Sequence, residues 1–461
     1  MQTRLVHFTR AILLAVVLAT VAPRTGAAAD AAAPLLTVVH AGTLLAAPPQ
    51  PPKPRQSLVL RGDRIVEIRD GFIDPATLQV PGQPAPRLVD LSNRFVLPGL
   101  LDGHVHLSFQ SGASPTLAYR QSDSEQALTT LVFARRTLAA GFTTVRDLAS
   151  GPEIVYAVRN ALAAGRFVGP RILAAGLPIT ARGGHGDFPG SREDLWQDAD
   201  VRQSGVCWDE GSCRDAVRLQ VKRGSDVIKL MASGGFSSGT GVLQQLSFEE
   251  MKAAVDAAHM RGVRVTTHAY APSAIADAVR AGVDSVEHGI GLDEKTAIEM
   301  AKRGTFFSPT LMVFNPPPQG GAPQRSFQAA AAAAAGDQSQ RAMSLALKHG
   351  VRIAFGTDTG VGWPHGSNAR EFALLVKAGL TPLQAIASAT TVAAENFGLA
   401  GDIGSLAPGK LADLVAVDGD PLADVTVLQR IDFVMKSGRI AKQDGRMLPA
   451  ENWDGDPFAY P

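Results

Sequence analysis

The chain has almost no net charge: across 461 residues, 44 Lys and Arg side chains oppose 43 Asp and Glu side chains, leaving +1. This balance gives no indication of binding to nucleic acid or to an acidic membrane surface. Beyond the first 30 residues, no apolar run approaches the roughly 20 residues that a membrane-spanning helix needs. We therefore expect a globular protein whose length suits one large domain and one smaller one.

Cysteine is scarce, with two residues, Cys207 and Cys213, in the run VCWDEGSC. A metal site is the less favoured interpretation, because no His or further Cys lies alongside them. In an oxidising compartment, two thiols this close should form a disulfide that contributes about 2 kcal/mol. The alternative is two free thiols, and both interpretations make the pair structural.

The N-terminus has the order of a secretory signal. Arg4 and Arg10 precede an apolar run at 11–22, and small residues end at Ala29. A membrane anchor is the weaker alternative, because the 12 apolar residues fall short of the roughly 17 to 25 that span a bilayer. We expect residues 1–29 to be a cleaved signal peptide, and the protein to be periplasmic or secreted, without a stable membrane anchor.

Short β-type runs occur near both ends of the chain and predict a small β-sandwich. They lie at 57–60, 64–68 and 94–97, and again at 414–417, 431–435 and 438–440. Because such strands occur near both ends, we expect one composite sandwich built from residues 30–96 and 400–461 together.

The middle of the chain, residues 97–399, alternates apolar strands with helical segments. The candidate strands are 99–107, 142–148, 171–175, 227–232, 264–268, 283–288, 305–311 and 352–357. Helical patterns lie between them, among them 153–164, 248–261 and 293–303, and the Ala-rich tract at 329–335 should also be helical. Eight such units predict an α/β fold, a (β/α)₈ TIM barrel inserted in the composite sandwich.

The run PGLLDGHVHL places His104 and His106 two residues apart on the first barrel strand. Side chains alternate along a strand, so both imidazoles should project from one face and can share a divalent metal. A single His-x-His is common by chance, so the interpretation depends on what other strand ends carry.

Four further ionisable side chains stand at strand ends, where a (β/α)₈ barrel carries its active site. They are Lys229, His268, His288 and Asp358. Strand eight neighbours strand one, so Asp358 can share a metal with the two histidines of strand one. Strands five and six are adjacent, so their histidines can hold a second metal, with the lysine between the groups.

Each of these residues has a structural alternative, such as a hydrogen-bonded His or a helix-capping Asp. Lys229 is the hardest to dismiss, because it lies within an apolar strand and a lone buried ammonium is strongly disfavoured. It needs a depressed pKa, a carboxylate partner or chemical conversion.

The runs PGLLDGHVHL, VIKLMASGG, TTHAY, SVEHG, FGTDTG and GSLAPGKLADLVAVDGDPL resemble the amidohydrolase superfamily over essentially the whole chain after the signal segment. The resemblance implies that Lys229 is carboxylated by CO₂ and bridges two divalent ions, with zinc the preferred metal. It also implies that Asp358 binds one metal and shuttles the proton. Manganese and cobalt remain alternatives, because these ligands accept several divalent ions.

Within the superfamily, the chain looks most like metal-dependent Xaa-Pro dipeptidases, related carboxypeptidases and ochratoxin-cleaving amidases. Mononuclear deaminases usually carry His-x-x-Glu after strand five, whereas this chain has His268-Ala-Tyr-Ala. The resemblance implies hydrolysis of dipeptides or small N-acyl amino acids by a metal-bridging hydroxide, with Asp358 acting as base and then acid.

Residues of the βα-loops are candidates for substrate contact. His185 and Tyr270 are expected to bind a substrate carboxylate or the oxyanion, and their alternatives are a loop-stabilising His and a packed Tyr. The other candidates are Ser233, Gly234 and Gly235, which let backbone approach the substrate, and His365 and Arg370 near the mouth.

Two competing functions remain. One keeps the site but cleaves a lactone or a cyclic amide, as imidazolonepropionases do; the other is a catalytically silent binding scaffold, disfavoured because all six ligands are present. The expected partners are a small-molecule or dipeptide substrate and further copies of this chain in a homo-oligomer.

Overall fold

The computed structural model describes residues 35–109, 120–187, 205–236, 240–315 and 326–449, with 326–333 as backbone only. The chain divides into two compact units, residues 1–34 and 35–461, and described residues occur only in the second. The predicted signal peptide at 1–29 lies outside the described residues.

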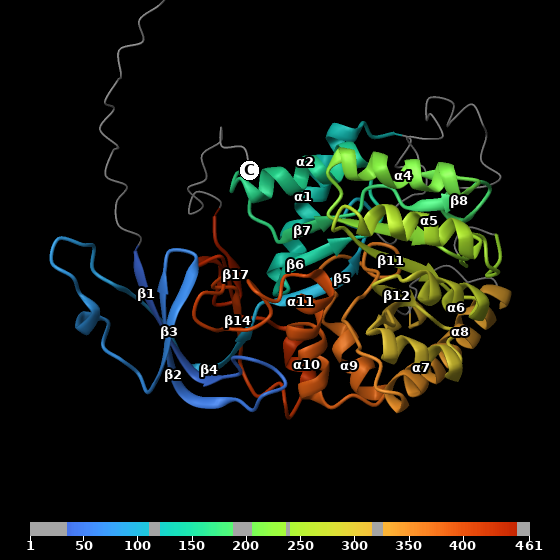
Figure 1. Cartoon of the computed structure of the whole chain (residues 1–461). Coiled ribbons are helices and arrows are strands. Elements are labelled where there is room, and N and C mark those ends of the chain that lie inside the picture. The colour runs from blue at the N-terminus through green and yellow to red at the C-terminus, as the bar shows by residue number, and fades with distance from the viewer. Residues whose placement is uncertain (1–34, 110–119, 188–204, 237–239, 316–325, 450–461) are drawn as a thin grey trace, which may run out of the picture. The chain divides into compact units, whose positions relative to one another are not determined.

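Strands from both ends of the chain form one mixed sheet (Figure 1). Its members are β1 Leu36–Leu44, β2 Lys53–Arg61, β3 Arg64–Asp70, β4 Arg87–Pro98, β14 Leu414–Val417, β15 Phe433–Lys436, β16 Arg439–Gln443 and β17 Arg446–Met447. Strand β4 joins the two groups, because it pairs parallel with β1 and antiparallel with β14. The predicted β-structure built from both ends of the chain is thereby confirmed, and the strands expected to form a sandwich are joined in one continuous mixed sheet.

Parallel strands and helices alternate around a barrel between these ends (Figure 1). One group of hydrogen-bonded parallel strands contains β5 Leu100–Val105, β6 Phe142–Asp147 and β7 Arg171–Ala174. The other group contains β8 Ile179–Ala181, β9 Val206–Cys207, β10 Val227–Met231, β11 Arg264–Ala269, β12 Ser285–His288 and β13 Phe306–Ser308. The predicted TIM-like fold is confirmed, and seven of the eight expected barrel strands are present. Strands β8 and β9 are additional.

The eighth expected strand, 352–357, is not a regular strand. It still closes the barrel, because Ala354 N–H donates to the Phe307 carbonyl (2.8 Å) and Gly103 N–H donates to the Phe355 carbonyl (2.9 Å). A Cβ at Gly356 would clash with the Ser308 side chain. The segment therefore packs closely against its neighbours without forming a regular strand, and the apolar pattern alone does not reveal this.

Helices surround the barrel strands (Figure 1). They are α1 Asp123–Ala139, α2 Pro152–Ala163, α4 Glu210–Arg223, α5 Phe248–His259, α6 Pro272–Ala281, α7 Glu294–Arg303, α8 Ser326–Lys348, α9 Arg370–Lys377, α10 Pro382–Ser388 and α11 Thr391–Phe397. The helices expected from the sequence correspond to α2, α5, α7 and α8. In the described part of the chain, no helix has the length and apolarity to cross a membrane.

The predicted disulfide joins Cys207 of β9 to Cys213 of α4. Strand β9 pairs with β8, and Arg182 N–H donates to the Cys207 carbonyl at 2.9 Å. The crosslink therefore anchors the segment that leads into the glycine-rich loop carrying His185.

Candidate metal centre

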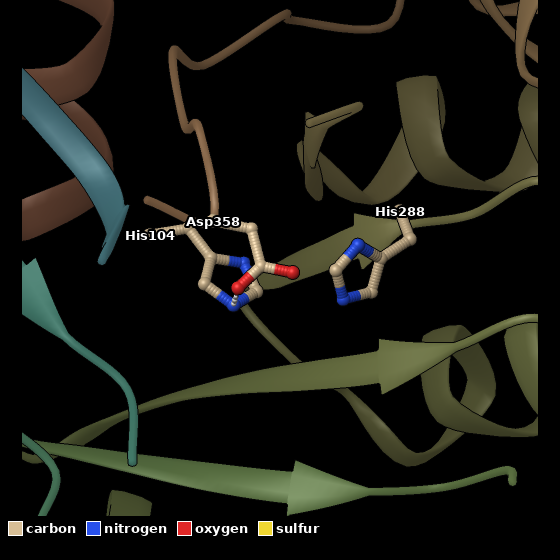
Figure 2. A group of neighbouring side chains, drawn as sticks. All are labelled: His104, His288 and Asp358. Atoms are coloured by element: carbon tan, nitrogen blue, oxygen red, sulfur yellow. Dashed lines mark ion pairs between the residues drawn. The ribbon is translucent and has the colours of Figure 1, made fainter. Parts of the chain in front are cut away.

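Three buried side chains converge at the C-terminal ends of barrel strands (Figure 2). His104 lies on β5, His288 ends β12, and Asp358 follows the irregular eighth segment. One potential ligand atom from each lies within 4.8 Å of the other two. This is the end of the barrel at which (β/α)₈ enzymes carry their active sites.

His106, the first residue after the end of β5, joins this group. Its Nε2 lies 3.0 Å from Asp358 Oδ1, and the Nε2 of His104 lies 3.6 Å from the same oxygen. Asp358 reaches both because its backbone N–H donates to the His104 carbonyl at 2.7 Å. The structure thus brings together the three residues that the sequence assigns to the first metal.

The histidines assigned to the second metal lie directly beside this group. The ring centroids of His268 and His288 are 4.7 Å apart, and those of His104 and His288 are 5.0 Å apart. Because the four imidazoles form one continuous cluster, the two predicted half-sites are adjacent parts of one centre.

In each of these four histidines, one ring nitrogen has a hydrogen-bond partner. The partners are the Glu287 carboxylate for His104 Nδ1 (3.0 Å), the Ala149 carbonyl for His106 Nδ1 (3.1 Å), the Gly234 carbonyl for His268 Nε2 (3.0 Å) and the Thr310 hydroxyl for His288 Nδ1 (2.7 Å). Metal-binding histidines are oriented in this way, because the partner of one nitrogen sets the tautomer and leaves the other to bind.

Lys229, on β10, is 1% exposed, and its Nζ has no hydrogen-bond partner among the described residues. Burial lowers the pKa of Lys229 to about 8, against the raising effects of the Glu287 and Asp358 charges. The described part of the site therefore holds a buried amine with no hydrogen-bond acceptor, which is the unfavourable burial that the sequence predicted for Lys229.

The histidines are held mostly in the neutral form. Burial, followed by the charge of Lys229, lowers the pKa of His104 to about 4. Burial also puts the pKa values of His268 and His288 well below the usual range. His106 is the exception: burial lowers its pKa, but the hydrogen bond and charge of Asp358 raise it overall. Neutral imidazole is the form that binds metal.

Backbone strain gathers at the same place. Six non-glycine residues in the described chain have positive φ, and three of them are His288 (67°), Thr310 (48°) and Asp358 (57°). Left-handed backbone is unfavourable for such residues and persists where surroundings impose it, commonly at functional sites.

The sequence analysis missed a buried ion pair below the cluster. Glu287, next to His288, accepts hydrogen bonds from Arg146 (2.8 Å), Ser285 (2.9 Å) and His104 (3.0 Å). Burial opposes its ionisation, but Arg146 and His104 hold the pKa of Glu287 well below its usual range. The available signal was a charged residue inside the short apolar strands β6 and β12.

Asp102 was missed for the same reason. It accepts the His104 N–H (3.0 Å), the Thr357 hydroxyl (2.7 Å) and the Asn368 side-chain amide (2.8 Å). It therefore ties β5 to the eighth segment and holds His104 beside Asp358.

Two substrate-contact candidates lie against the cluster. The ring centroid of His268 is 4.6 Å from that of His185 and 4.5 Å from that of Tyr270. Burial, and then the Asp358 charge, raise the pKa of Tyr270, so the phenol stays protonated and can donate a hydrogen bond.

The Ser-Gly-Gly candidates support these rings. Ser233 Oγ accepts the Tyr270 N–H at 2.8 Å, and the Gly234 carbonyl accepts from His268. A Cβ at Gly235 would come within 2.6 Å of the His185 ring, so glycine is required there.

His365 contacts the backbone of His106 and of Phe109, whereas Arg370 lies against Trp363. His365 Nε2 donates to the Phe109 carbonyl at 2.8 Å, and its ring stacks on Phe133 at 4.9 Å. The exposed Arg370 guanidinium lies 4.9 Å from the centroid of the Trp363 ring. A role for either in substrate binding stays a prediction.

Comparisons with known proteins agree with this geometry. The model of the amidohydrolase family matches residues 95–441. The ochratoxinase of Aspergillus niger is 30% identical over 436 residues, which cover 89% of this chain and 87% of that protein. A Xaa-Pro dipeptidase, solved with methionine in its active site, is 34% identical with a TM-score of 0.79 over 88% of this chain and 100% of that one. A prolidase solved with N-methylphosphonate-L-proline is 33% identical, with the same TM-score and coverage.

Proposed function

This chain belongs to the amidohydrolase family, and we propose that it hydrolyses the amide bond of dipeptides or small N-acyl amino acids. Membership makes it a metal-dependent hydrolase of C–N bonds. One observation carries the proposal: four buried histidines and Asp358 form a single cluster in which every imidazole is already oriented through one ring nitrogen.

The described residues fit a centre of two divalent ions, with zinc the expected metal. His104, His106 and Asp358 would hold one ion, and His268 and His288 the other. Lys229 would complete the set as a carbamate: its neutral amine forms a C–N bond to CO₂ and loses one proton. This conversion supplies the anionic ligand that the buried Nζ, without a protein partner, favours.

Ions bound there would supply Lewis-acid activation of water and of the scissile carbonyl. The chain's own residues then handle the proton. Asp358, with Oδ1 at 3.0 Å from His106 Nε2, is placed to accept a proton at the carboxylate and deliver it to the leaving nitrogen.

The substrate class is supported by the relatives. The dipeptidase and the prolidase were solved with an amino acid and a proline phosphonate, both of which carry an α-carboxylate. In this chain, His185 and the protonated Tyr270 are the groups placed to receive such a carboxylate. The Phe236 and Phe314 rings lie 5.1 and 6.1 Å from Tyr270 and offer an apolar wall for a side chain.

A release assay tests the proposal. Protein purified with zinc and bicarbonate would be assayed on dipeptides with varied C-terminal residues, on N-acyl amino acids and on lactones, with metal content measured in parallel. We expect two zinc ions and hydrolysis of a subset of the amides. Cleavage of lactones alone would favour the alternative bond, and absence of bound metal would favour a binding scaffold.

Export is part of the proposal, supported by the signal-like N-terminus and by the Cys207–Cys213 disulfide, a crosslink that persists in oxidising compartments. N-terminal sequencing of the mature protein should begin at Asp30. The homo-oligomeric state stays a prediction that light scattering can check.

A further inference from the structure

We propose that Glu371, on α9, is a positioning residue that holds His288 in its metal-binding orientation by acting through Thr310. The inference rests on the metal role proposed for His288. It concerns a residue that lies outside the imidazole cluster and belongs to none of the motifs that the sequence analysis recognised.

Thr310 stands before the short helix η5, Leu311–Phe314, in the position of an N-cap. A threonine there ordinarily uses its own hydroxyl to accept a backbone N–H of the first turn. Thr310 does not cap η5, because its Oγ1 lies 2.7 Å from His288 Nδ1. The hydroxyl that would ordinarily cap the start of η5 therefore contacts the histidine instead.

Glu371 takes over the capping from another helix. Its Oε1 accepts the Leu311 N–H and its Oε2 accepts the Met312 N–H, each at 2.8 Å. Glu371 is completely buried, and burial raises the pKa of its carboxyl to about 8, although the two N–H donors lower it. A buried carboxyl is costly unless it is hydrogen-bonded, and the two N–H donors of η5 supply that compensation.

These hydrogen bonds also hold a strained backbone. Thr310 has φ +48°, and left-handed conformations of non-glycine residues cost on the order of 1–3 kcal/mol. Such a conformation persists only where neighbouring groups impose it. Without Glu371, Thr310 is free to relax to negative φ, which moves its hydroxyl away from His288 and releases the ring from one tautomer and one orientation.

The test uses the metal-free protein labelled at histidine. Ring ¹⁵N resonances report the tautomer of His288, and amide exchange reports the Leu311 and Met312 hydrogen bonds. For Glu371→Gln, we expect exchange of these amides to be about tenfold faster and the His288 ring to populate both tautomers, with the His104 ring unchanged. Zinc affinity by calorimetry should fall about 10- to 100-fold, the usual effect of losing an outer hydrogen-bond partner.

Two further variants separate positioning from general damage. Thr310→Val should reproduce the His288 change, and the double variant should add nothing to either single one, because both act through one link. Glu395→Gln, an exposed glutamate paired with Arg352 at 3.0 Å, is the matched control and should change neither reading.

The proposal is overturned if Glu371→Gln leaves the His288 tautomer and zinc affinity unchanged, or if it shifts His104 and His288 alike. If that variant fails to fold, Glu371→Asp, whose shorter side chain retracts both oxygens, takes its place with the same expected readings. These readings do not depend on turnover, so failure of the proposed amide hydrolysis would be seen separately.

Discussion

Strand β11 begins at Arg264 and passes through His268, and the neighbouring β12 follows Asp284 and ends at His288. At the beginning of these strands, Asp284 pairs with Arg264 at 3.2 Å and with His259 at 2.9 Å. At their other end, a few residues away, the two histidines are buried against each other. The same strands thus carry paired, partly exposed ionisable groups at one end and buried histidines at the other.

We call the N-terminal ends of the strands the lower end of the barrel and their C-terminal ends the upper end. At the lower end, each of these charged side chains has a partner of opposite charge and is partly exposed to solvent, as in the exposed Arg352–Glu395 pair. Such pairs contribute roughly 0–1 kcal/mol each. At the upper end, the Lys229 Nζ has no protein partner within the described residues, and His288 and Asp358 have strained backbones. The contrast teaches that the lower end is complete in the protein alone, whereas the upper end is arranged for something that the protein must bind.

Among these substitutions, we expect the greatest change in activity from replacing Lys229 at the upper end of the barrel. Lys229→Met should lower kcat/KM by ~10³-fold or more, because it removes a residue that we propose would help to hold the metal ions and so weakens the activation that they would supply. The metal-free protein should be as stable or about 1 kcal/mol more stable, because an apolar side chain replaces a buried, unpartnered amine. Metal analysis, kinetics and urea unfolding of the metal-free protein measure these changes.

Lys252→Met, which removes an exposed lysine paired with Asp256, is the control and should alter neither metal content nor rate. Full activity of Lys229→Met with two metals bound would contradict the assigned role.

Asp358→Asn removes a proton acceptor at the upper end of the barrel while keeping the shape of the site. We expect most bound metal to remain and kcat to fall roughly 10²- to 10⁴-fold, the range for loss of general acid–base catalysis. Asp284→Asn, at the lower end of the barrel, should leave kcat unchanged. Retained turnover in Asp358→Asn would refute the proton-transfer role.

Glu287→Gln tests the buried charge pair beneath the centre. It leaves the Arg146 guanidinium buried without its carboxylate, and breaking such a pair costs about 3–5 kcal/mol in free energy of unfolding. Glu395→Gln, which breaks an exposed pair with Arg352, should cost less than about 1 kcal/mol. Urea unfolding of the two metal-free variants compares them directly, and equal losses would show that burial does not distinguish the two ends.

The smallest effect concerns His259 at the lower end. Its hydrogen bond to Asp284 raises the pKa of His259, against the lowering effect of burial. The pair therefore stabilises the fold below the unfolded-state pKa of about 6.5, and this contribution is lost as pH rises through the higher folded-state pKa. Because the His259 side chain is 42% exposed, solvent screening limits the contribution to well under about 1 kcal/mol.

Stability of the wild type and of His259→Gln, measured at pH 5.5 and pH 8, checks the sign. The difference between the two proteins should be larger at the lower pH; a larger difference at pH 8 would show that the pair acts in the opposite sense.

Much of the site was predictable because (β/α)₈ topology converts sequence position into spatial position. A histidine at the end of one strand and an aspartate at the end of its neighbour must lie close, so His104, His106 and Asp358 could be grouped from the chain alone. The irregular course of 352–357 could not be predicted, because an apolar run does not reveal how closely Gly356 packs against Ser308 in the folded chain. Glu371 gave no signal either, because a glutamate in the first turn of an amphipathic helix is normally exposed.

Which side chains meet follows from the order of residues in the chain, since the alternation of strand residues and the order of strands leave those six residues little choice of end or face. Only the tertiary structure decided which nitrogen of each ring is available for metal. That choice depends on partners 22 to 183 residues away in the chain, such as Thr310 for His288 and Glu287 for His104. A hydrogen bond acts over about 3 Å, so its partner is whichever group the finished fold brings within reach.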